Sequence, residues 1–319
     1  MPQLIDEVVG DFEQAVLAGL AQPQKVIPAR FFYDRRGSEL FEQITQLPEY
    51  YPTRTETALL RAHGDDIARY TGTGRTVVEF GSGSSTKTPL LLSAVRARTY
   101  VPIDISGPFL ADAAAGLAKA YPNLKVLPIA GDFTRPLCLP EAIATDAMLG
   151  FFPGSTIGNF APQQAVDLLR SFAATFGEDG RLVIGIDLRK NPRLIETAYD
   201  DAGGVTAAFN LNLLHRINNE LGGDVPIELF EHRAIWHDAL GRIEMHLAAS
   251  RDLSFEAAGR RFAMQAGETI HTENSYKYRP EEARLLARAS GWEPMAAWSD
   301  ADALFSLHVW QVQGRKLEP

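Results

Sequence analysis

The chain has 319 residues, of which 45% are hydrophobic and 22% are charged, values close to those of ordinary globular proteins. This composition excludes a disordered, collagen-like or coiled-coil chain, and the length predicts about two domains or one large α/β domain with an insertion. The 40 acidic residues outnumber the 31 basic ones, and the resulting net charge of −9 argues against nucleic acid as a partner.

No targeting signal is expected in the first residues of the printed sequence. MPQLIDEVVGDFEQAVLAGL mixes acidic and apolar residues at helical spacing, without the basic and apolar regions of a signal peptide. No stretch reaches the roughly 18 apolar residues that span a bilayer. The single cysteine, Cys138, cannot form an internal disulfide, fits a reducing compartment and is expected to be a small core side chain. We therefore expect a cytoplasmic protein, and a monomer.

Two helix starts are expected before residue 60. In RFFYDRRGSELF, Tyr33 precedes a charged loop and a helix that Ser38 is expected to cap. In TRTE, Thr53 and Glu56 have the spacing of a capping box, which predicts a helix over TETALLRAHGDDIARY.

Between residues 75 and 190, short β-branched runs alternate with helical segments. This alternation is typical of βαβ units in a parallel sheet. The predicted strands are Thr76–Phe80, Thr99–Ile103, Lys125–Ile129, Ala147–Phe151 and Arg181–Ile186. Joined by right-handed crossovers, five such strands form an open, doubly wound α/β sheet.

After residue 190 this rhythm stops. Residues 190–222 look helical throughout, and residues 225–278 look like antiparallel strands such as RIEMHLAAS and RRFAM. RPEEARLLARASGWEP then predicts a helix, and FSLHVWQV a strand that could return to the edge of the first sheet. We therefore predict one α/β domain of residues 56–189 and 279–319, interrupted by a mixed α+β insertion, 190–278, that packs with residues 1–55.

A glycine turn follows the first strand of the predicted sheet. In VVEFGSGSSTK, Gly81-Ser82-Gly83 stands between a buried strand and a helix, where glycine lets the backbone turn tightly and approach a ligand. The third glycine of a dinucleotide fingerprint is missing, because Ser85 and Thr86 stand in its place. Lys87 of the same segment is included among the candidate cofactor-binding residues.

Acidic residues follow the next two strands. Asp104 ends the second strand, where a carboxylate can reach the ribose hydroxyls of a nucleoside. Asp132 and Phe133 follow the third strand, and an acid beside an aromatic ring suits adenine. Each feature alone also occurs as an ordinary turn or helix cap. Together they favour an adenosyl ligand without a pyrophosphate, S-adenosylmethionine rather than NAD.

Four segments carry a resemblance to a known family. RFFYDRRGSELFEQITQLPEYYPTRTE, GSGSSTKT, FFPGSTIGNF and ENSYKY resemble the ergothioneine-pathway L-histidine Nα-methyltransferases, and the similarity covers essentially the whole chain. The resemblance implies a class I (Rossmann-like) methyltransferase domain with an inserted substrate-binding domain. It also implies S-adenosylmethionine as donor and stepwise trimethylation of the α-amino group of L-histidine to the betaine hercynine.

The resemblance also implies roles for several side chains. Tyr33 would approach the reacting amine, and Tyr50 or Tyr51 would approach the substrate, although the sequence does not decide which of the pair faces inward. Tyr199 matches a position that grips the substrate carboxylate, and Met245 would line the same pocket. For any one tyrosine the alternative is a core ring with a satisfied hydroxyl, and for the methionine a core filler.

Three more residues have a chemical reason to bind an amino acid. Asn159, in the loop after the fourth strand, can donate and accept, so it can hold a carboxylate or steer an amine, although it could instead cap the helix near Pro162. Glu273 and Ser275 are two residues apart on an extended segment and so share a face. A carboxylate and a hydroxyl there can accept from and donate to an imidazole, and with the resemblance we expect this role.

No metal site is expected. None of the seven histidines forms a metal-ligand spacing, and His232 and His237 are expected to be an exposed or capping pair.

Three other functions are alternatives for this sequence. One is methylation of another aromatic amino acid, such as tryptophan or a prenylated derivative. Glu273 argues against it, because an indole gains less from a hydroxyl–carboxylate pair. The others are a catalytically silent adenosyl-binding protein, which the intact set of Gly81, Gly83, Asp104 and Asn159 opposes, and an NAD-dependent oxidoreductase.

Overall fold

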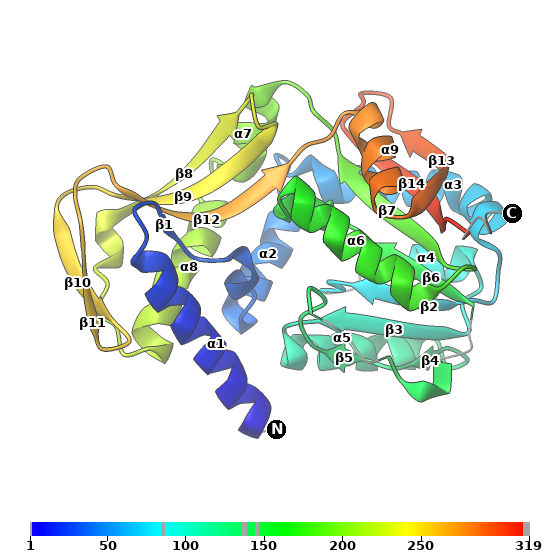
Figure 1. Cartoon of the computed structure of the whole chain (residues 1–319), viewed down its shortest axis with the longest axis horizontal. Coiled ribbons are helices and arrows are strands. Elements are labelled where there is room, and N and C mark those ends of the chain that lie inside the picture. The colour runs from blue at the N-terminus through cyan, green and yellow to red at the C-terminus, as the bar shows by residue number, and fades with distance from the viewer. Residues whose placement is uncertain (1, 84–86, 136–138, 144–146, 315–319) are drawn as a thin grey trace, which may run out of the picture. The chain divides into compact units, whose positions relative to one another are not determined.

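The chain folds into two compact units, each made of two separate stretches of sequence (Figure 1). Unit 1 comprises Met1–Tyr50 and Asn191–Ser275, and unit 2 comprises Tyr51–Lys190 and Tyr276–Pro319. The predicted domains have slightly different boundaries, at residues 55, 189 and 278. The structure, a computed structural model, describes residues 2–83, 87–135, 139–143 and 147–314, so Cys138 lies outside the described residues.

Unit 2 is built on the predicted α/β sheet, whose strands follow the order β13-β14-β7-β6-β2-β3-β4 with β5 beside β3. Strands β2 to β7 pair in parallel, and β14 pairs antiparallel with both β7 and β13. The strand bounds are β2 Thr76–Phe80, β3 Thr99–Asp104, β4 Lys125–Val126, β5 Ile129–Ala130, β6 Met148–Phe152, β7 Arg181–Asp187, β13 Trp292–Ser299 and β14 Phe305–Val312. The prediction of an open, doubly wound sheet is confirmed.

Helices bury both faces of this sheet, which explains why its central parallel strands are mostly apolar. On β2, Val78 and Phe80 contribute to one core and Val77 to the other, as strand alternation requires. Side chains of α6 and α9 complete the first core, and side chains of α3, α4 and α5 complete the second. The bounds are α3 Tyr51–Thr71, α4 Thr88–Ala94, α5 Gly107–Ala120, α6 Pro162–Phe176 and α9 Pro280–Ala289, with short 3₁₀ helices at Glu141–Ile143 and Thr156–Asn159.

Two strand predictions and one helix prediction need correction. The single strand Lys125–Ile129 is two short strands, separated at Leu127-Pro128, where proline offers no N–H to the ladder. The helix expected to continue through GWEP ends at Ala289, and Gly291, with a φ of +83°, turns the chain into the unpredicted strand β13. Strand β14 is therefore not the edge of the sheet, because β13 lies outside it.

Two predicted helix caps are also wrong. Helix α3 begins at Tyr51, so Thr53 lies inside it, and Glu56 is a fully buried side chain rather than part of a capping box. Helix α2, Arg35–Thr45, is capped by Asp34, whose Oδ1 accepts from the N–H of Gly37 at 2.7 Å. Ser38 lies within that helix and is buried.

Unit 1 combines helices with a four-stranded sheet of order β1-β12-β9-β8 and a hairpin of β10 and β11. Its strands are β1 Lys25–Val26, β8 Phe230–His237, β9 Arg242–Ala249, β10 Leu253–Ala257, β11 Arg260–Met264 and β12 Thr269–Tyr276. Its helices are α1 Pro2–Leu20, α2, α7 Pro192–Tyr199 and α8 Val205–Glu220, with 3₁₀ turns at Ala29–Phe32 and Ile227–Leu229. The predicted helical stretch 190–222 is thus two helices, separated near Gly204, whose φ is +70°. In the described part of the chain, no helix is long and apolar enough to cross a membrane.

A buried charge cluster lies at the end of β7. Asp187 is fully buried, and the Tyr51 hydroxyl lies 2.9 Å from both of its carboxylate oxygens. Lys277 Nζ lies 2.7 Å from Oδ2, and Lys190 Nζ binds Oδ1 and the Tyr51 hydroxyl. Tyr51 and Lys190 are terminal residues of one stretch of unit 2, and Lys277 is the second residue of the other. One carboxylate therefore ties together the places where the chain enters and leaves this unit.

The charges of this cluster depend on one another. Burial by itself raises the pKa of Asp187, but the ammonium groups of Lys277 and Lys190 outweigh it and hold the pKa below its ordinary value. Burial also lowers the pKa of Lys190 to about 8, although Asp187 opposes that shift. The carboxylate is thus ionised at neutral pH and compensates two buried cations.

Replacement of Asp187 by Asn should destabilise unit 2 severely. The change leaves buried ammonium groups without their counter-charge, a defect that costs about 3–5 kcal/mol. Urea denaturation should show this loss, whereas Asp167→Asn on the exposed face of α6 should change stability by no more than about 0.5 kcal/mol. Equal denaturation midpoints for Asp187→Asn and the wild type would contradict the role of the carboxylate.

Candidate active site

The glycine turn after β2 is fixed to the end of β3. The N–H groups of Gly81 and Ser82 donate to the carbonyl oxygen of Ile103, at 2.9 and 3.2 Å. The N–H of Gly83 donates to Asp104 Oδ2 at 2.9 Å. Gly81 and Gly83 have φ values of +70° and +50°, which favour glycine. Two predicted parts of the cofactor site, the turn and Asp104, are therefore in direct contact.

Asp104 has acceptor capacity beyond the turn. Its Oδ1 accepts from the N–H of Ser106 at 2.9 Å, so each oxygen holds at least one backbone group. A carboxylate offers about four acceptor positions, which suits further hydroxyl donors. Burial raises the pKa of Asp104, and the backbone N–H groups of Ser106 and Gly83 oppose this rise.

Ser82 gives an independent indication of a polar ligand at the turn. Its side chain is buried, and its Oγ has no hydrogen-bond partner among the described residues. A buried hydroxyl without a partner is uncommon in folded proteins. With the open backbone at Gly81 and Gly83 and the Asp104 carboxylate, this atom fits a nucleoside bound at the turn.

The residues after the third predicted strand are already engaged. Asp132 Oδ1 accepts from the N–H and hydroxyl of Thr134, at 2.9 and 2.6 Å. The ring of Phe133 contacts Phe80 and Phe152 edge-on, with centroid distances of 6.1 and 5.6 Å. Phe133 lies beside the glycine turn, since a Cβ at Gly81 would be 3.5 Å from its ring. Their adenine-binding role stays a prediction.

Lys87 pairs with Glu56, an acid predicted only as part of a capping box. Glu56 is fully buried, binds the Lys87 ammonium, and accepts from the N–H of Gly154 at 2.9 Å. It thus joins the segment after the glycine turn to the loop after β6. The sequence contains a signal for the burial of Glu56, because helical spacing places it on the same face as Leu59 and Leu60.

A second buried acid lies on β2 itself. Glu79 accepts from the Thr88 hydroxyl at 2.7 Å and from the Tyr100 hydroxyl at 2.6 Å. Burial raises the pKa of Glu79 to about 7, although these two hydrogen bonds oppose the rise. An acid within an otherwise apolar strand directly before the glycine turn was the sequence signal for it.

The loop after β6 presents Asn159. Gly154 and Ser155 have φ values of +74° and +57°, and for serine this left-handed backbone is strained. The Ser155 hydroxyl stabilises it by accepting from the N–H of Asp187 at 2.9 Å. Asn159 ends the following 3₁₀ turn, is half-buried, and its side chain makes no hydrogen bond within the described residues. The alternative that it caps α6 is wrong, since Ala161 holds that position.

The predicted tyrosines of unit 1 belong to one row of aromatic rings. Tyr33 contacts Phe41 and Phe209 at centroid distances of 5.7 and 5.8 Å. Phe41 contacts Tyr50 at 6.3 Å, and Tyr50 contacts Tyr199 at 6.5 Å. Three residues predicted separately, at positions 33, 50 and 199, are therefore connected by packing.

The two adjacent tyrosines have different surroundings. Tyr50 is in the aromatic row of unit 1, and Tyr51 is fully buried with its hydroxyl on Asp187 in unit 2. Tyr51 is thus a member of the buried charge cluster, which leaves Tyr50 as the better candidate for a substrate contact.

Ser275 and Tyr199 meet in unit 1. The Tyr199 hydroxyl donates to Ser275 Oγ at 2.8 Å, and both side chains are buried. Glu273 is half-buried two residues earlier on β12. Met245 is buried on β9, and its carbonyl oxygen accepts from the Thr272 hydroxyl at 3.0 Å. The structure therefore connects a residue expected at the carboxylate with one expected at the imidazole.

For His232, the capping alternative of the expectation is confirmed and the exposed one is wrong. Its ring is half-buried, with Nδ1 2.9 Å from Asn210 Nδ2 and Nε2 2.8 Å from the carbonyl oxygen of Tyr199. Burial lowers the pKa of His232. This histidine is therefore not exposed but caps the C-terminal end of α7, because its Nε2 bonds the carbonyl oxygen of Tyr199, the last residue of that helix. His237, by contrast, has a side chain that is 44% exposed.

Comparisons with known proteins identify relatives along almost the whole chain. Residues 12–312 match the model of a family described as "Histidine-specific methyltransferase, SAM-dependent". A histidine N-alpha-methyltransferase of Mycolicibacterium smegmatis is 38% identical, over 95% of this chain and 96% of that protein. Ergothioneine biosynthesis protein 1 of Neurospora crassa is 30% identical, over 89% of this chain and 33% of that protein. A 4-dimethylallyltryptophan N-methyltransferase of Aspergillus fumigatus is 28% identical, over 91% of both chains.

Glu79 predicts how stability changes with pH. The pKa is about 7 in the folded chain and near 4.5 when unfolded, so the folded state binds the extra proton. The stability contributed by this proton is complete below pH 4.5 and is lost as the pH rises through about 7. Urea denaturation measures the free energy of unfolding of Glu79→Gln relative to that of the wild type. We expect this difference to be more favourable to the variant at pH 8 than at pH 5, by on the order of 2–3 kcal/mol.

The exposed Glu178→Gln in the same unit controls for loss of one negative charge. If Glu79→Gln and Glu178→Gln followed the same pH dependence, Glu79 would not be the titrating group.

Proposed function

Because the chain belongs to the family of histidine-specific, SAM-dependent methyltransferases, we propose that it methylates the α-amino nitrogen of L-histidine three times to give hercynine. The observation that carries this conclusion is the family match over residues 12–312, which includes residues of both units. The protein is an S-adenosylmethionine-dependent N-methyltransferase with a small amino-acid substrate. The Neurospora relative supports a place in ergothioneine biosynthesis. A cytoplasmic location and a monomeric state stay predictions.

The glycine turn and Asp104 are proposed to hold the cofactor. When bound, S-adenosylmethionine supplies an electrophilic methyl group on its sulfonium. The Asp104 carboxylate accepts from the ribose hydroxyls, while Gly81 and Gly83 leave room for the ligand beside the backbone. Ser82 Oγ, buried without a partner in the described chain, supplies a further polar contact. Phe133 and Asp132 are proposed to face the adenine.

Asn159 and Tyr33 are proposed to act at the amine. The free α-amino group has a pKa of about 8 and must be neutral before it can attack a methyl group. Asn159 supports this role because its half-buried amide makes no hydrogen bond to any described residue and can accept from the amine. Methyl transfer then depends mainly on holding the nitrogen in line with the methyl carbon. We assign no single general base.

Glu273 and Ser275 are proposed to recognise the imidazole. Glu273 accepts from the ring N–H, and Ser275 donates to the other ring nitrogen. The Ser275 oxygen accepts from Tyr199, which orients the serine hydroxyl. For Tyr199 to grip the substrate carboxylate, its hydroxyl proton must turn from Ser275 to the ligand. Tyr50 and Met245 are proposed to provide the apolar walls.

The tryptophan alternative has one observation in its favour: one relative is named a 4-dimethylallyltryptophan N-methyltransferase. Two observations favour histidine instead. The histidine-methylating relative is 38% rather than 28% identical. In addition, an indole has one N–H and no second ring nitrogen for the Ser275 hydroxyl, so it can form one hydrogen bond fewer than an imidazole with the proposed pair.

Asp104→Ala should weaken cofactor binding. The change removes charge-assisted hydrogen bonds of roughly 1.5–3 kcal/mol, which corresponds to about a ten- to hundredfold loss of affinity. Isothermal titration with S-adenosylhomocysteine measures this directly, with Asp112→Ala on the exposed face of α5 as the matched control. Unchanged affinity in Asp104→Ala would remove this residue from the cofactor site.

The substrate assignment is tested by competition. The wild-type enzyme, offered equal histidine, tryptophan, tyrosine and phenylalanine, should methylate histidine alone, up to the trimethylated product seen by mass spectrometry. A pocket built for hydrogen bonds rejects ligands that lack them by about 10⁴–10⁵. Preferential methylation of tryptophan would overturn the histidine assignment and leave the methyltransferase activity intact.

Variants of the same assay test Glu273. Glu273→Ala should lose histidine activity and relax the preference toward larger aromatic amino acids. Glu231→Ala, an exposed carboxylate on β8, should retain the wild-type pattern. Full histidine selectivity in Glu273→Ala would show that another residue reads the imidazole.

A further inference from the structure

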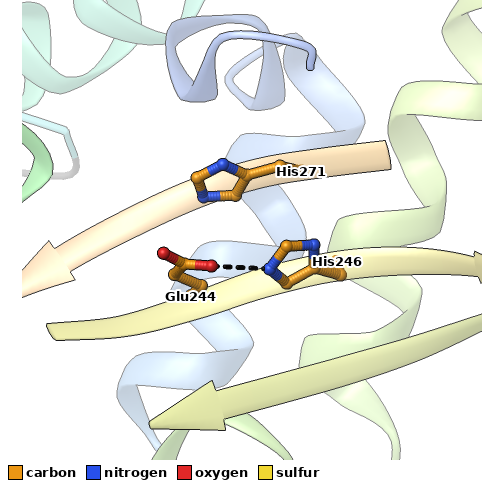
Figure 2. A group of neighbouring side chains, drawn as sticks. All are labelled: Glu244, His246 and His271. Carbon is orange, nitrogen blue, oxygen red and sulfur yellow. Dashed lines mark hydrogen bonds and ion pairs between the residues drawn. The ribbon is translucent and has the colours of Figure 1, made fainter. Parts of the chain in front are cut away.

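Three side chains with metal-binding atoms lie together in the sheet of unit 1 (Figure 2). Glu244 and His246 are on β9, and His271 is on β12. One potential ligand atom of each lies within 4.8 Å of those of the other two. None of these side chains has a part in the proposed methyl transfer. The three residues have no metal-ligand spacing in the sequence, and only the arrangement of the strands brings them together.

The strands explain why these groups converge. Glu244 and His246 are two residues apart on one strand, so their side chains share a face. The sheet order places β12 next to β9, and the His246 and His271 rings stack with centroids 4.8 Å apart and planes 16° apart. Glu244 and His246 are each only 6% exposed. Two of the three side chains are thus buried, and His271 is half-buried.

Each of the three side chains also has a partner outside the trio. Arg242 Nε donates to Glu244 Oε1 at 2.7 Å. His246 Nδ1 lies 3.1 Å from the Thr269 hydroxyl, and His271 Nε2 lies 3.0 Å from the carbonyl oxygen of Glu273. Such outer hydrogen bonds orient histidine and carboxylate ligands in metal sites and sharpen their affinity.

The spacing is close to what a tetrahedral ion needs. Metal–ligand bonds of 2.0–2.2 Å place neighbouring ligand atoms roughly 3.3 Å apart. Here His246 Nε2 and Glu244 Oε2 are 2.8 Å apart, and the widest separation in the trio is within 4.8 Å. Side-chain rotations that tilt the stacked rings and move these atoms by about 1 Å would suffice, with no change in the strands.

We propose that Glu244, His246 and His271 bind one divalent transition-metal ion of the Zn²⁺ type, with water as the fourth ligand. Two imidazoles and a carboxylate are a ligand set that Zn²⁺, Co²⁺ and Ni²⁺ accept, whereas Mg²⁺ and Ca²⁺ prefer oxygen alone. His237, whose Nε2 is 3.2 Å from Glu244 Oε2, offers a further imidazole nitrogen that can replace the water.

The test uses untagged full-length protein, freed of metal by a chelator and kept without L-histidine, which itself binds Zn²⁺. Isothermal titration should show one Zn²⁺ bound per chain and no binding of Mg²⁺. Co²⁺ should give the visible absorption of a tetrahedral nitrogen–oxygen site. Zn²⁺ should also raise the thermal unfolding midpoint, since a ligand of the folded state stabilises it.

Substitutions locate the site. His246→Ala, His271→Ala and Glu244→Gln should each remove the Co²⁺ spectrum and weaken Zn²⁺ binding by more than the roughly 10- to 100-fold that loss of an outer hydrogen-bond partner costs. His215→Ala, an exposed histidine on α8, should leave both unchanged. Circular dichroism of the metal-free variants shows whether each variant still folds, which separates loss of a ligand from loss of the fold. His246→Gln gives a second test, because glutamine fills more of the space left by the imidazole than alanine does.

Absence of Zn²⁺ binding in the wild type would overturn the proposal. Binding that persists at full strength in all three variants would do so as well, because it would place the ion elsewhere. Neither result would affect the proposed methyltransferase function, which is measured with metal-free protein.

Discussion

The fully buried carboxylate of Asp187 is the interaction on which the organisation of unit 2 depends. It binds Tyr51, Lys190 and Lys277, which stand at or next to the ends of the two stretches of sequence that form this unit. A buried carboxylate is costly unless it is compensated, and here two ammonium groups and a hydroxyl compensate it. The chain leaves this unit and later returns to it. Contacts between the two stretches, and not the backbone alone, must therefore hold the unit together.

The same principle recurs along the carboxyl ends of the parallel strands. Glu79 on β2 holds the hydroxyls of Thr88 and Tyr100, and Asp104 at the end of β3 holds the glycine turn. Glu56 joins Lys87 to the loop after β6. Acidic side chains therefore shape the edge of the sheet at which α/β proteins bind their ligands. These side chains hold irregular loops in place. Asp104 also has hydrogen-bond acceptor positions left for a ligand.

Much of this architecture could be predicted from local patterns. The strands at Thr76–Phe80 and Phe305–Val312 were predicted with their observed bounds, because apolar β-branched runs between turn residues are a local signal. Strand β13 was missed because Gly291 ends α9 earlier than the helical pattern suggested. The capping box at Thr53 failed for a related reason. A capping pattern describes only spacing, whereas burial of Glu56 against Lys87 and Gly154 decided its actual role.

The sequence by itself determined the family, the parallel sheet, the glycine turn with Asp104, and the candidate substrate residues, since each depends on motifs or periodicities within a short segment. Only the tertiary structure decided which of two adjacent tyrosines belongs to which unit, that Tyr199 binds Ser275, and that His271 lies beside Glu244 and His246. These contacts join residues from different strands and helices. Their proximity depends on strand order and on the burial of charge, neither of which a local sequence pattern records.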